Sequence, residues 1–161
     1  MVKTVTKDDI FNLLAGLSDP EIPVVTIEEM GMLRDAIIHD EGVDIIITPT
    51  YTGCPAMGII EQDIIATLHN FGIAQVNIKT VYSPAWTTDW MTEATKEKLR
   101  QYGIAPPSGS CSSAFVSQPE VACPQCSSNN THLISQHGST ACKALYKCND
   151  CQEPFDYFKC H

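Results

Sequence analysis

The sequence predicts an α+β protein in two parts: a small domain with a mixed sheet, and a short domain organised around four cysteines. Three observations support this prediction. Apolar residues in the first hundred positions indicate the order helix, strand, strand, helix, strand, helix. A segment rich in Pro, Gly and Ser follows, and two Cys-x-x-Cys units come after it. We therefore expect a first domain at 1–103, a linker at 104–120 and a second domain at 121–161.

The first predicted helix begins near Thr6. Thr6 and Asp9 have the spacing of a capping box, in which each side chain bonds the backbone N–H of the other residue. Apolar residues then recur at helical spacing, at Ile10, Leu13, Leu14 and Leu17. The helix should end before Pro20, because the residue that precedes a proline avoids helical backbone angles.

A hairpin and a crossover helix are predicted next. The hairpin turns at 40–42, and its second strand contains three consecutive isoleucines, which favours burial on both faces. A helix with one apolar face follows and leads into a third strand. The predicted strands lie at 32–39, 43–48 and 76–82, and the helix at 55–71. A hairpin followed by a crossover connection is typical of a mixed sheet.

One more helix closes the first predicted domain. It should begin at or near Thr88, because apolar and small residues recur from there at spacings of three and four. Gly103 follows directly and is the residue type that most often ends a helix. The residues on the predicted inner face are Met91, Thr95, Leu99 and Tyr102.

Composition and charge exclude several classes of function. The chain has 161 residues, 43% hydrophobic and 18% charged, with a net charge of −9. Such a chain is globular, and its acidity disfavours nucleic acids and anionic membrane surfaces as partners. The N-terminal stretch lacks the pattern of a signal peptide, and no run approaches the roughly 20 apolar residues of a membrane span. We therefore expect a cytoplasmic protein, whose eight cysteines serve as metal ligands or reactive thiols rather than disulfides.

Two Cys-x-x-Cys units in the second domain have the spacing of a metal-binding ribbon. Each unit presents two thiolates from one tight turn, and two such turns complete a tetrahedral site. The four predicted ligands are Cys123, Cys126, Cys148 and Cys151. We expect structural zinc in a zinc-ribbon-like domain, whose folding energy the metal would supply. Iron or an iron–sulfur cluster remains the alternative, since four thiolates also suit these.

Three further residues are candidate additional ligands. Cys142 is either a replacement ligand or a small buried apolar residue. Cys160 and His161 are adjacent, and they are candidates for a second metal, a structural pair, or a free thiol in a frayed tail. The sequence assigns no role to Cys111.

Cys54 stands apart from the other cysteines, in the stretch TPTYTGCPAM between a strand and a helix. If Pro55 opens the helix, Cys54 is its cap, and the N–H groups and dipole of the helix end favour a thiolate or a metal-bound sulfur. Thr50 and Thr52 add hydroxyl groups to the same loop. The alternative is a buried cysteine without a role. A cysteine–histidine hydrolase is disfavoured, because nothing near His39 or His69 would orient either as a base.

Two segments carry a resemblance to known families. LSDPEIPVVTIEEMGMLRDAII and TPTYTGCPAM resemble the iron–sulfur cluster assembly domain family, which includes SufT-like proteins. The marks of that family are an Asp-Pro-Glu segment and a later Thr-x-x-x-Cys-Pro segment. Here they are Asp19-Pro20-Glu21 and Thr50 to Pro55. The later segments, among them HGSTACKALYKCNDCQEPFDYFKCH, resemble the PaaD family, the D component of the phenylacetyl-CoA epoxidase system in aerobic phenylacetate catabolism.

The resemblance implies an accessory protein rather than a catalyst. Its first domain would have the iron–sulfur-assembly-like α+β fold and would help to mature or deliver an iron or iron–sulfur centre of the epoxidase system. Cys54 would be the transfer site, with Asp19 and Glu21 beside it and Thr50 and Thr52 shaping its pocket. The alternative for Asp19 and Glu21 is a turn that only ends the preceding helix. Implied partners are the oxygenase subunits of the epoxidase and its flavin/iron–sulfur reductase. One cysteine cannot hold a cluster, so a homodimer or a client protein would complete the ligands.

A scaffold is the alternative function, in which the ribbon docks epoxidase subunits and Cys54 is inert. A direct oxygenase or hydrolase is disfavoured. The sequence contains no His-Glu-x-x-His motif, no Glu-x-x-His pair for a di-iron site and no nucleotide-binding loop.

Overall fold

The computed structural model describes residues 5–111 and 119–161, and its internal contacts divide the chain into two compact units, Met1–Trp86 and Thr87–His161. The sequence places the first boundary later, at residue 103. The difference arises because the last helix of the predicted first domain is followed directly by a short strand of the second unit. Part of the predicted linker, 112–118, lies outside the described residues.

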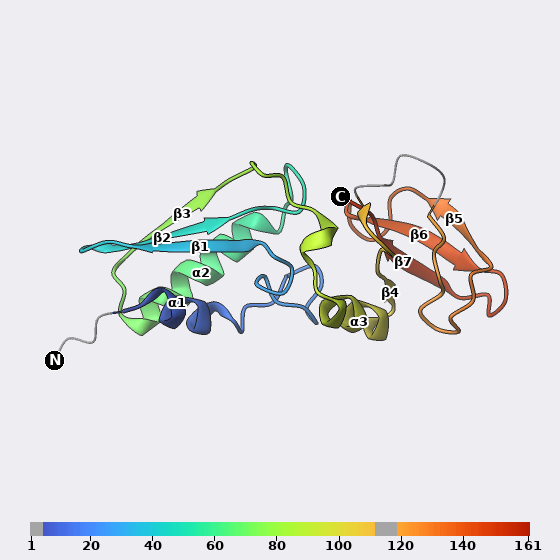
Figure 1. The fold of residues 1–161 in the computed structure, drawn as a ribbon, viewed down its shortest axis with the longest axis horizontal. Helices are drawn as coiled ribbons and strands as arrows, with labels where there is room; N and C mark the ends of the chain where they lie inside the picture. The colour runs from blue at the N-terminus through green and yellow to red at the C-terminus, as the bar shows by residue number, and fades with distance from the viewer. Residues whose placement is uncertain (1–4, 112–118) are drawn as a thin grey trace. The chain divides into compact units, whose positions relative to one another are not determined.

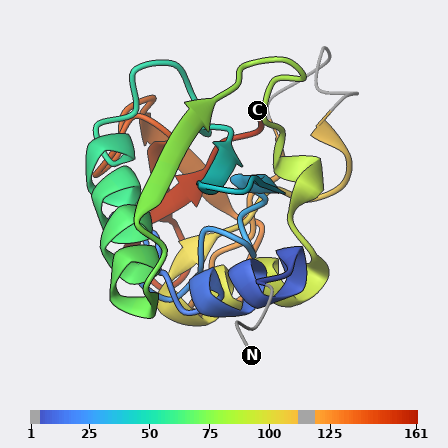
Figure 2. The ribbon, with the colours of Figure 1, turned by 90° about the vertical axis from the view of Figure 1, so that its left-hand side faces the viewer.

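The first unit is a two-layer structure with a three-stranded mixed sheet. Its strands are β1 (Leu33–Ile38), β2 (Gly42–Ile47) and β3 (Gln75–Thr80), in the order β1-β2-β3. The β1 and β2 strands are antiparallel, whereas β2 and β3 are parallel and are joined by the crossover helix α2 (Met57–Phe71). Helix α1 (Lys7–Leu14) and α2 lie on the same side of the sheet (Figure 1), and α2 runs beside β3 (Figure 2). The predicted order and mixed sheet are confirmed.

The start of α1 also confirms its predicted cap. The Asp9 backbone N–H donates to Thr6 Oγ1 at 3.2 Å, and the Thr6 N–H donates to Asp9 Oδ2 at 3.0 Å. This reciprocal pair satisfies two N–H groups that a helix end would otherwise leave open.

The core of the first unit lies between the sheet and its helices. Alternate residues of β2 are buried there, as are three residues of α2 spaced four apart: Val43, Ile45, Ile47, Ile60, Ile64 and Leu68. Ile46, between two of them, is only partly buried. The expectation that the isoleucine run is buried on both faces is therefore wrong, because within the described part of the first unit helices cover one face of the sheet only.

Asp44 is a buried carboxylate among cationic and amide groups. It points away from the helix-covered face, since it alternates with Val43 and Ile45 along β2. Lys79 Nζ and His39 Nε2 lie 2.5 Å and 3.1 Å from Asp44 Oδ2, and the Asn77 amide donates to Oδ1 at 3.3 Å. The Lys79 ammonium, followed by His39, lowers the pKa of Asp44 to about 2.

Acid is expected to weaken the first unit through Asp44. Because its folded pKa of about 2 lies below the ordinary 3.8, its contribution to stability is present above pH 3.8 and is lost as the pH falls through about 2. The variant Asp44→Asn lacks this contribution at every pH. Urea titrations of both proteins are followed by the amide signals of β2. The difference between their free energies of unfolding should decrease as the pH falls from 3.8 to about 2. A difference in unfolding free energy that does not change with pH would contradict the lowered pKa of Asp44.

The second unit begins with two short helices. A 3-10 helix, η1 (Thr88–Trp90), is separated from α3 (Glu93–Tyr102) by Met91 and Thr92. The sequence predicts one continuous helix here, and that prediction is wrong. Met91 has extended backbone angles, and the Thr92 side chain accepts the Thr95 N–H as the cap of a new helix. The predicted end is confirmed, since Gly103 has a φ of 95°.

The rest of the second unit is a four-stranded sheet in the order β4-β7-β6-β5. Its strands are β4 (Ile104–Ala105), β5 (Thr131–Ser135), β6 (Lys143–Cys148) and β7 (Pro154–Phe158). The stretches THLISQ and ALYKC between the two Cys-x-x-Cys units predict short strands, which correspond to β5 and β6, whereas the sequence pattern predicts neither β4 nor β7. The buried face gathers small and aromatic residues, which are Ala105, Val121, Cys123, Ala144, Tyr146, Cys148, Phe155 and Tyr157. In the part of the chain that is described, no helix has the length and apolar character needed to cross a bilayer.

Candidate functional site

Cys54 lies in the loop between β2 and α2. Gly53, with a φ of 82°, turns the backbone just before it. Helix α2 begins at Met57 and its N-cap is Ala56, so the prediction that Cys54 caps the helix is wrong. A hydrogen bond from the Met57 N–H to the Cys54 carbonyl forms a turn ahead of the helix. The Ala56 N–H donates to the Cys54 sulfur, so the sulfur still lies at the N-terminal approach to α2.

The thiol of Cys54 is less acidic than an ordinary cysteine, contrary to the sequence-based expectation. Burial is the main reason, because the residue is 8% exposed and a thiolate would lose its hydration. The negative charges of Glu21 and Asp19 raise the pKa further, against the hydrogen bonds from the Ala56 N–H and the Tyr51 hydroxyl. At neutral pH the sulfur therefore carries its proton.

Asp19 and Glu21 come from a turn that the fold brings close to Cys54. Asp19 is buried, and its Oδ1 accepts the N–H groups of Glu21 at 2.7 Å and of Ile22 at 3.1 Å. Asp19 thus shapes the turn that presents Glu21. Both carboxylates are near enough to act electrostatically on the Cys54 sulfur. The structure therefore brings together three of the residues that the sequence singles out.

Thr50 and Thr52 line a neighbouring small cavity of about 90 Å³. Tyr82 and Trp86 line its other side, and Cys54 is not among its lining residues. The Trp86 indole is held in place by a 2.7 Å hydrogen bond to the Met30 carbonyl. The sequence analysis did not identify Tyr82 and Trp86 as lining residues. The only local signal for them is the aromatic stretch YSPAW that follows β3. A larger cavity of about 570 Å³, lined by His39, Asp44, His69 and their neighbours, contains none of the predicted site residues.

Four cysteine sulfurs of the second unit form a compact group. The Sγ atoms of Cys123, Cys126, Cys148 and Cys151 lie within 4.8 Å of one another. Two of the pairs, Cys123 with Cys151 and Cys126 with Cys148, are 3.7 Å and 3.6 Å apart. A tetrahedron of sulfurs about 2.3 Å from one metal ion has edges of roughly 3.8 Å. The donor set and its spacing therefore fit a four-thiolate metal site.

Both Cys-x-x-Cys turns have the same backbone geometry. The residue after each second cysteine has a positive φ, 63° at Ser127 and 64° at Gln152. The Ser127 N–H bonds the Cys123 carbonyl at 2.9 Å, which closes the first turn. A tight turn of this kind lets both cysteines of a unit bind one metal ion.

Two cysteines of this group, Cys148 and Cys151, have thiol pKa values shifted in opposite directions. The N–H groups of Cys151 and Asp150 donate to the Cys148 sulfur and lower its pKa to about 7, although burial opposes them. For Cys151, the Glu153 N–H favours the thiolate, but burial and the three neighbouring sulfurs together raise the pKa to about 12. Four thiolates at this distance repel one another, so a bound cation is what would hold all four ionised.

The three other candidate ligands lie outside this group. Cys142 is buried and its sulfur lies 3.0 Å from Thr140 Oγ1. The His161 imidazole donates to the Cys142 carbonyl, and burial lowers the pKa of His161 despite that bond. Cys160 is bonded through its sulfur to Cys111, with the two Cα atoms 5.3 Å apart. The disulfide corrects both the idea of Cys160 as a metal ligand and the expectation that the chain has no disulfide.

Two family models match the chain. Residues 7–80 match an iron–sulfur cluster assembly protein model, and residues 107–159 match the PaaD zinc beta ribbon domain. The chain is also 51% identical over 152 residues to the D component of a putative 1,2-phenylacetyl-CoA epoxidase of Escherichia coli K12, covering 94% of this chain and 92% of that protein. The chain belongs to the PaaD family.

Other relatives of this PaaD-family chain share a smaller part of it. An Fe-S protein maturation auxiliary factor of Porphyromonas gingivalis is 31% identical, and one of Bacillus subtilis is 30% identical. Each covers 58% of this chain, and the matches span 90% and 92% of the two relatives. More than a third of this chain therefore has no counterpart in them.

Two solved structures share the fold over a similar fraction. A domain of unknown function DUF59 from Bacillus anthracis has a TM-score of 0.54 at 25% identity, covering 58% of this chain and 90% of its own. A conserved hypothetical protein of Thermotoga maritima has a TM-score of 0.53 at 30% identity, covering 62% and 98%. These neighbours support the α+β fold.

Proposed function

We propose that this protein is an accessory factor of a phenylacetyl-CoA epoxidase system that matures or delivers an iron or iron–sulfur centre, and that it is not itself the catalyst. One observation carries the proposal. In the unit that matches the iron–sulfur assembly model, Asp19 and Glu21 lie near enough to Cys54 to act electrostatically on its sulfur. The names of the relatives, an epoxidase component and maturation factors, support the same role.

The charges around Cys54 favour a cation over a bare thiolate. Burial is the main cause that keeps the proton on the sulfur, and the negative charges of Asp19 and Glu21 add to it; the same two charges attract an iron cation. When the sulfur binds the metal, its proton is released, and the metal's charge removes the repulsion. Soft sulfur with hard carboxylate oxygen suits iron that is held transiently as cargo. A second copy of the chain or the client would supply the ligands that one cysteine cannot.

The four-cysteine group has a different role in this proposal. Four cysteines leave no open position for cargo, so we assign it structural zinc. The metal would stabilise a sheet whose buried face is too small to be stable alone. A factor that handles thiol-bound iron would work in a reducing compartment, and we place it in the cytoplasm.

The variant Cys54→Ala tests the delivery role. The wild-type protein and the variant are each co-expressed with the oxygenase subunits and the flavin/iron–sulfur reductase, and the iron bound to each purified partner is measured. We expect the iron content of one partner to fall at least about fivefold with the variant, because the sulfur ligand is lost. Glu21→Gln should lower it in the same direction, since it removes a charge that attracts the cation.

The matched control is Cys142→Ala, which removes a buried cysteine from the second unit and leaves the Cys54 loop intact. Client iron should then stay at the wild-type level. If Cys54→Ala leaves every partner fully loaded while the variant is folded, the delivery role is wrong.

A scaffold is the second candidate function, and the ribbon favours it. The maturation factors cover 58% of this chain, so the PaaD-type ribbon is the part we take to be specific to the epoxidase system. A docking ribbon would leave Cys54→Ala without effect on client iron, whereas Cys123→Ser would abolish co-purification of the epoxidase subunits. The two variants therefore separate the two functions.

A further inference from the structure

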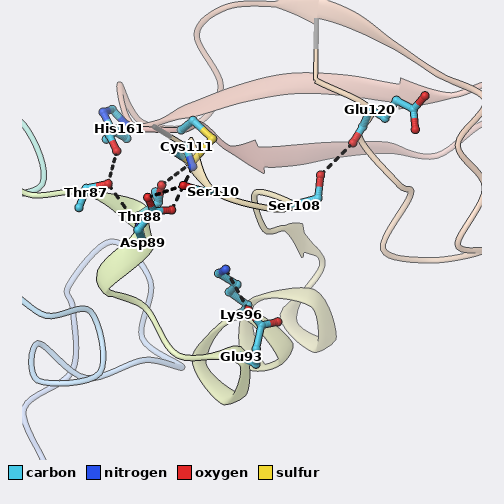
Figure 3. The surroundings of a disulfide bond; sticks show 11 residues. Thr87, Thr88, Asp89, Glu93, Lys96, Ser108, Ser110, Cys111, Glu120 and His161 are labelled. Carbon is cyan, nitrogen blue, oxygen red and sulfur yellow. Dashed lines mark hydrogen bonds and ion pairs between the residues drawn. A yellow bond between two sulfur atoms is a disulfide. The ribbon is translucent and has the colours of Figure 1, made fainter. Parts of the chain in front are cut away.

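A disulfide joins two distant parts of the second unit. Cys111 follows β4 and Cys160 lies next to the last residue, 49 positions later, and their sulfurs are bonded (Figure 3). Both residues are partly exposed, so a dissolved thiol can reach the bond. The loop that the bond closes contains all four cysteines of the metal group.

Cys111, and His161 next to Cys160, are both hydrogen-bonded to the same short segment, Thr87 and the 3-10 helix η1. On one side, Thr88 Oγ1 lies 2.7 Å from Cys111 Sγ, and the Cys111 N–H donates to Asp89 Oδ1 at 3.0 Å. On the other side, the carbonyl of His161 accepts the Thr87 hydroxyl at 2.6 Å and the Thr88 N–H at 3.3 Å. Figure 3 shows these contacts converging on η1. The helix itself has three residues, too few to be stable without such support.

The four-cysteine group constrains the redox conditions under which the second unit can hold a metal. The four clustered sulfurs bind metal only as thiolates, so this group holds a metal only while its thiols stay reduced. Under such conditions an accessible disulfide exchanges with the surrounding thiols and is regulatory more often than structural. We propose that the Cys111–Cys160 pair is a reversible thiol–disulfide switch that fastens the chain end to η1 when oxidised and releases it when reduced.

The reaction is ordinary thiol–disulfide exchange with a small thiol of the glutathione class. A thiolate of the small molecule attacks one sulfur of the pair, the S–S bond breaks, and a mixed disulfide forms while the other cysteine leaves as a thiolate and takes up a proton. A second small thiol attacks the mixed disulfide and releases the remaining cysteine thiol. Two electrons pass to the protein, and the two small thiols become one disulfide. The reverse sequence closes the switch.

Opening the bond should loosen η1 and the chain end together. The hydrogen bonds of Thr87 and Thr88 to His161 remain possible after reduction, but the chain end is no longer held beside them. Residues 159–161 lie outside the strands, and such segments open more readily when no crosslink holds them. Thr88, which is 1% exposed, would then exchange its amide proton with solvent more often.

Hydrogen exchange of the full, metal-loaded chain tests the proposal. It is measured in oxidised glutathione and in millimolar reduced glutathione, with metal content and free thiols determined in parallel. We expect reduction to free two thiols without loss of metal, to speed exchange at Thr88 and Lys159 at least roughly tenfold, and to be reversed on reoxidation. Cys111→Ser and Cys160→Ser should exchange like the reduced protein in both buffers.

The control is Cys142→Ser, which removes a cysteine of the same unit outside the disulfide and should keep the full response. If reduced glutathione fails to open the bond, the disulfide is a permanent crosslink and the proposal is wrong. It is equally wrong if the bond opens and exchange at Thr88 and Lys159 does not change. Neither result bears on iron delivery by Cys54, which is tested through the client.

Discussion

Replacing Cys148 with serine is expected to release the metal of the second unit and to unfold its sheet. Cys148 is fully buried at the end of β6, and its sulfur lies 3.6 Å from that of Cys126. A serine hydroxyl does not ionise near neutral pH and replaces a thiolate poorly. Metal binding contributes about 10–16 kcal/mol in small zinc domains, as much as the whole stability of an ordinary domain. The metal per chain should fall from about one to below roughly 0.1.

The metal is measured by elemental analysis, and the sheet by hydrogen exchange of β5, β6 and β7. Cys142→Ser is the control, because Cys142 is equally buried and adjoins β6 but lies outside the four-sulfur group. It should retain the metal and a protected sheet. A Cys148→Ser protein that keeps both would show that the group is not a metal site on which the fold depends.

Replacing Gly42 with valine should destabilise the first unit strongly. Gly42 opens β2 and pairs with Gln75 at the start of β3. A Cβ at position 42 would overlap the Gln75 carbonyl oxygen and would lie 2.6 Å from the Gln75 Cβ. Backbone cannot yield to such an overlap without separating the strands, so we expect a loss of at least about 3 kcal/mol in the free energy of unfolding. Urea unfolding followed by the amide signals of β2 and β3 measures it.

Gly58 is the matched control in the same unit. It lies in the first turn of α2, and a Cβ there would have no atom within 4 Å. Gly58→Ala should therefore raise stability by about 0.5–1 kcal/mol, because alanine loses less backbone freedom in a helix. If both variants had the same small effect, the close approach of β2 and β3 would not limit position 42.

The helix cap of α1 and the four metal ligands were predictable because their sequence signals are local. The capping box of Thr6 and Asp9 spans a single helical turn, and each Cys-x-x-Cys unit spans a single knuckle. Residues this close in sequence are close in space in almost any fold. The four metal ligands could therefore be named without knowing how β6 and β7 pair. The break between η1 and α3 was not predictable in this way, because Met91 and Thr95 also satisfy helical spacing.

The sequence by itself determined the order of helices and strands in the first unit and the membership of the four-cysteine group. Tertiary structure alone decided the acidity of Cys54 and the partner of Cys160. The pKa of a thiol depends on burial and on charges that arrive from other turns, here those of Glu21 and Asp19. A disulfide requires two Cα atoms to come within about 7 Å, and a separation of 49 residues does not reveal that approach. Both properties depend on distances between remote residues, which only the folded chain sets.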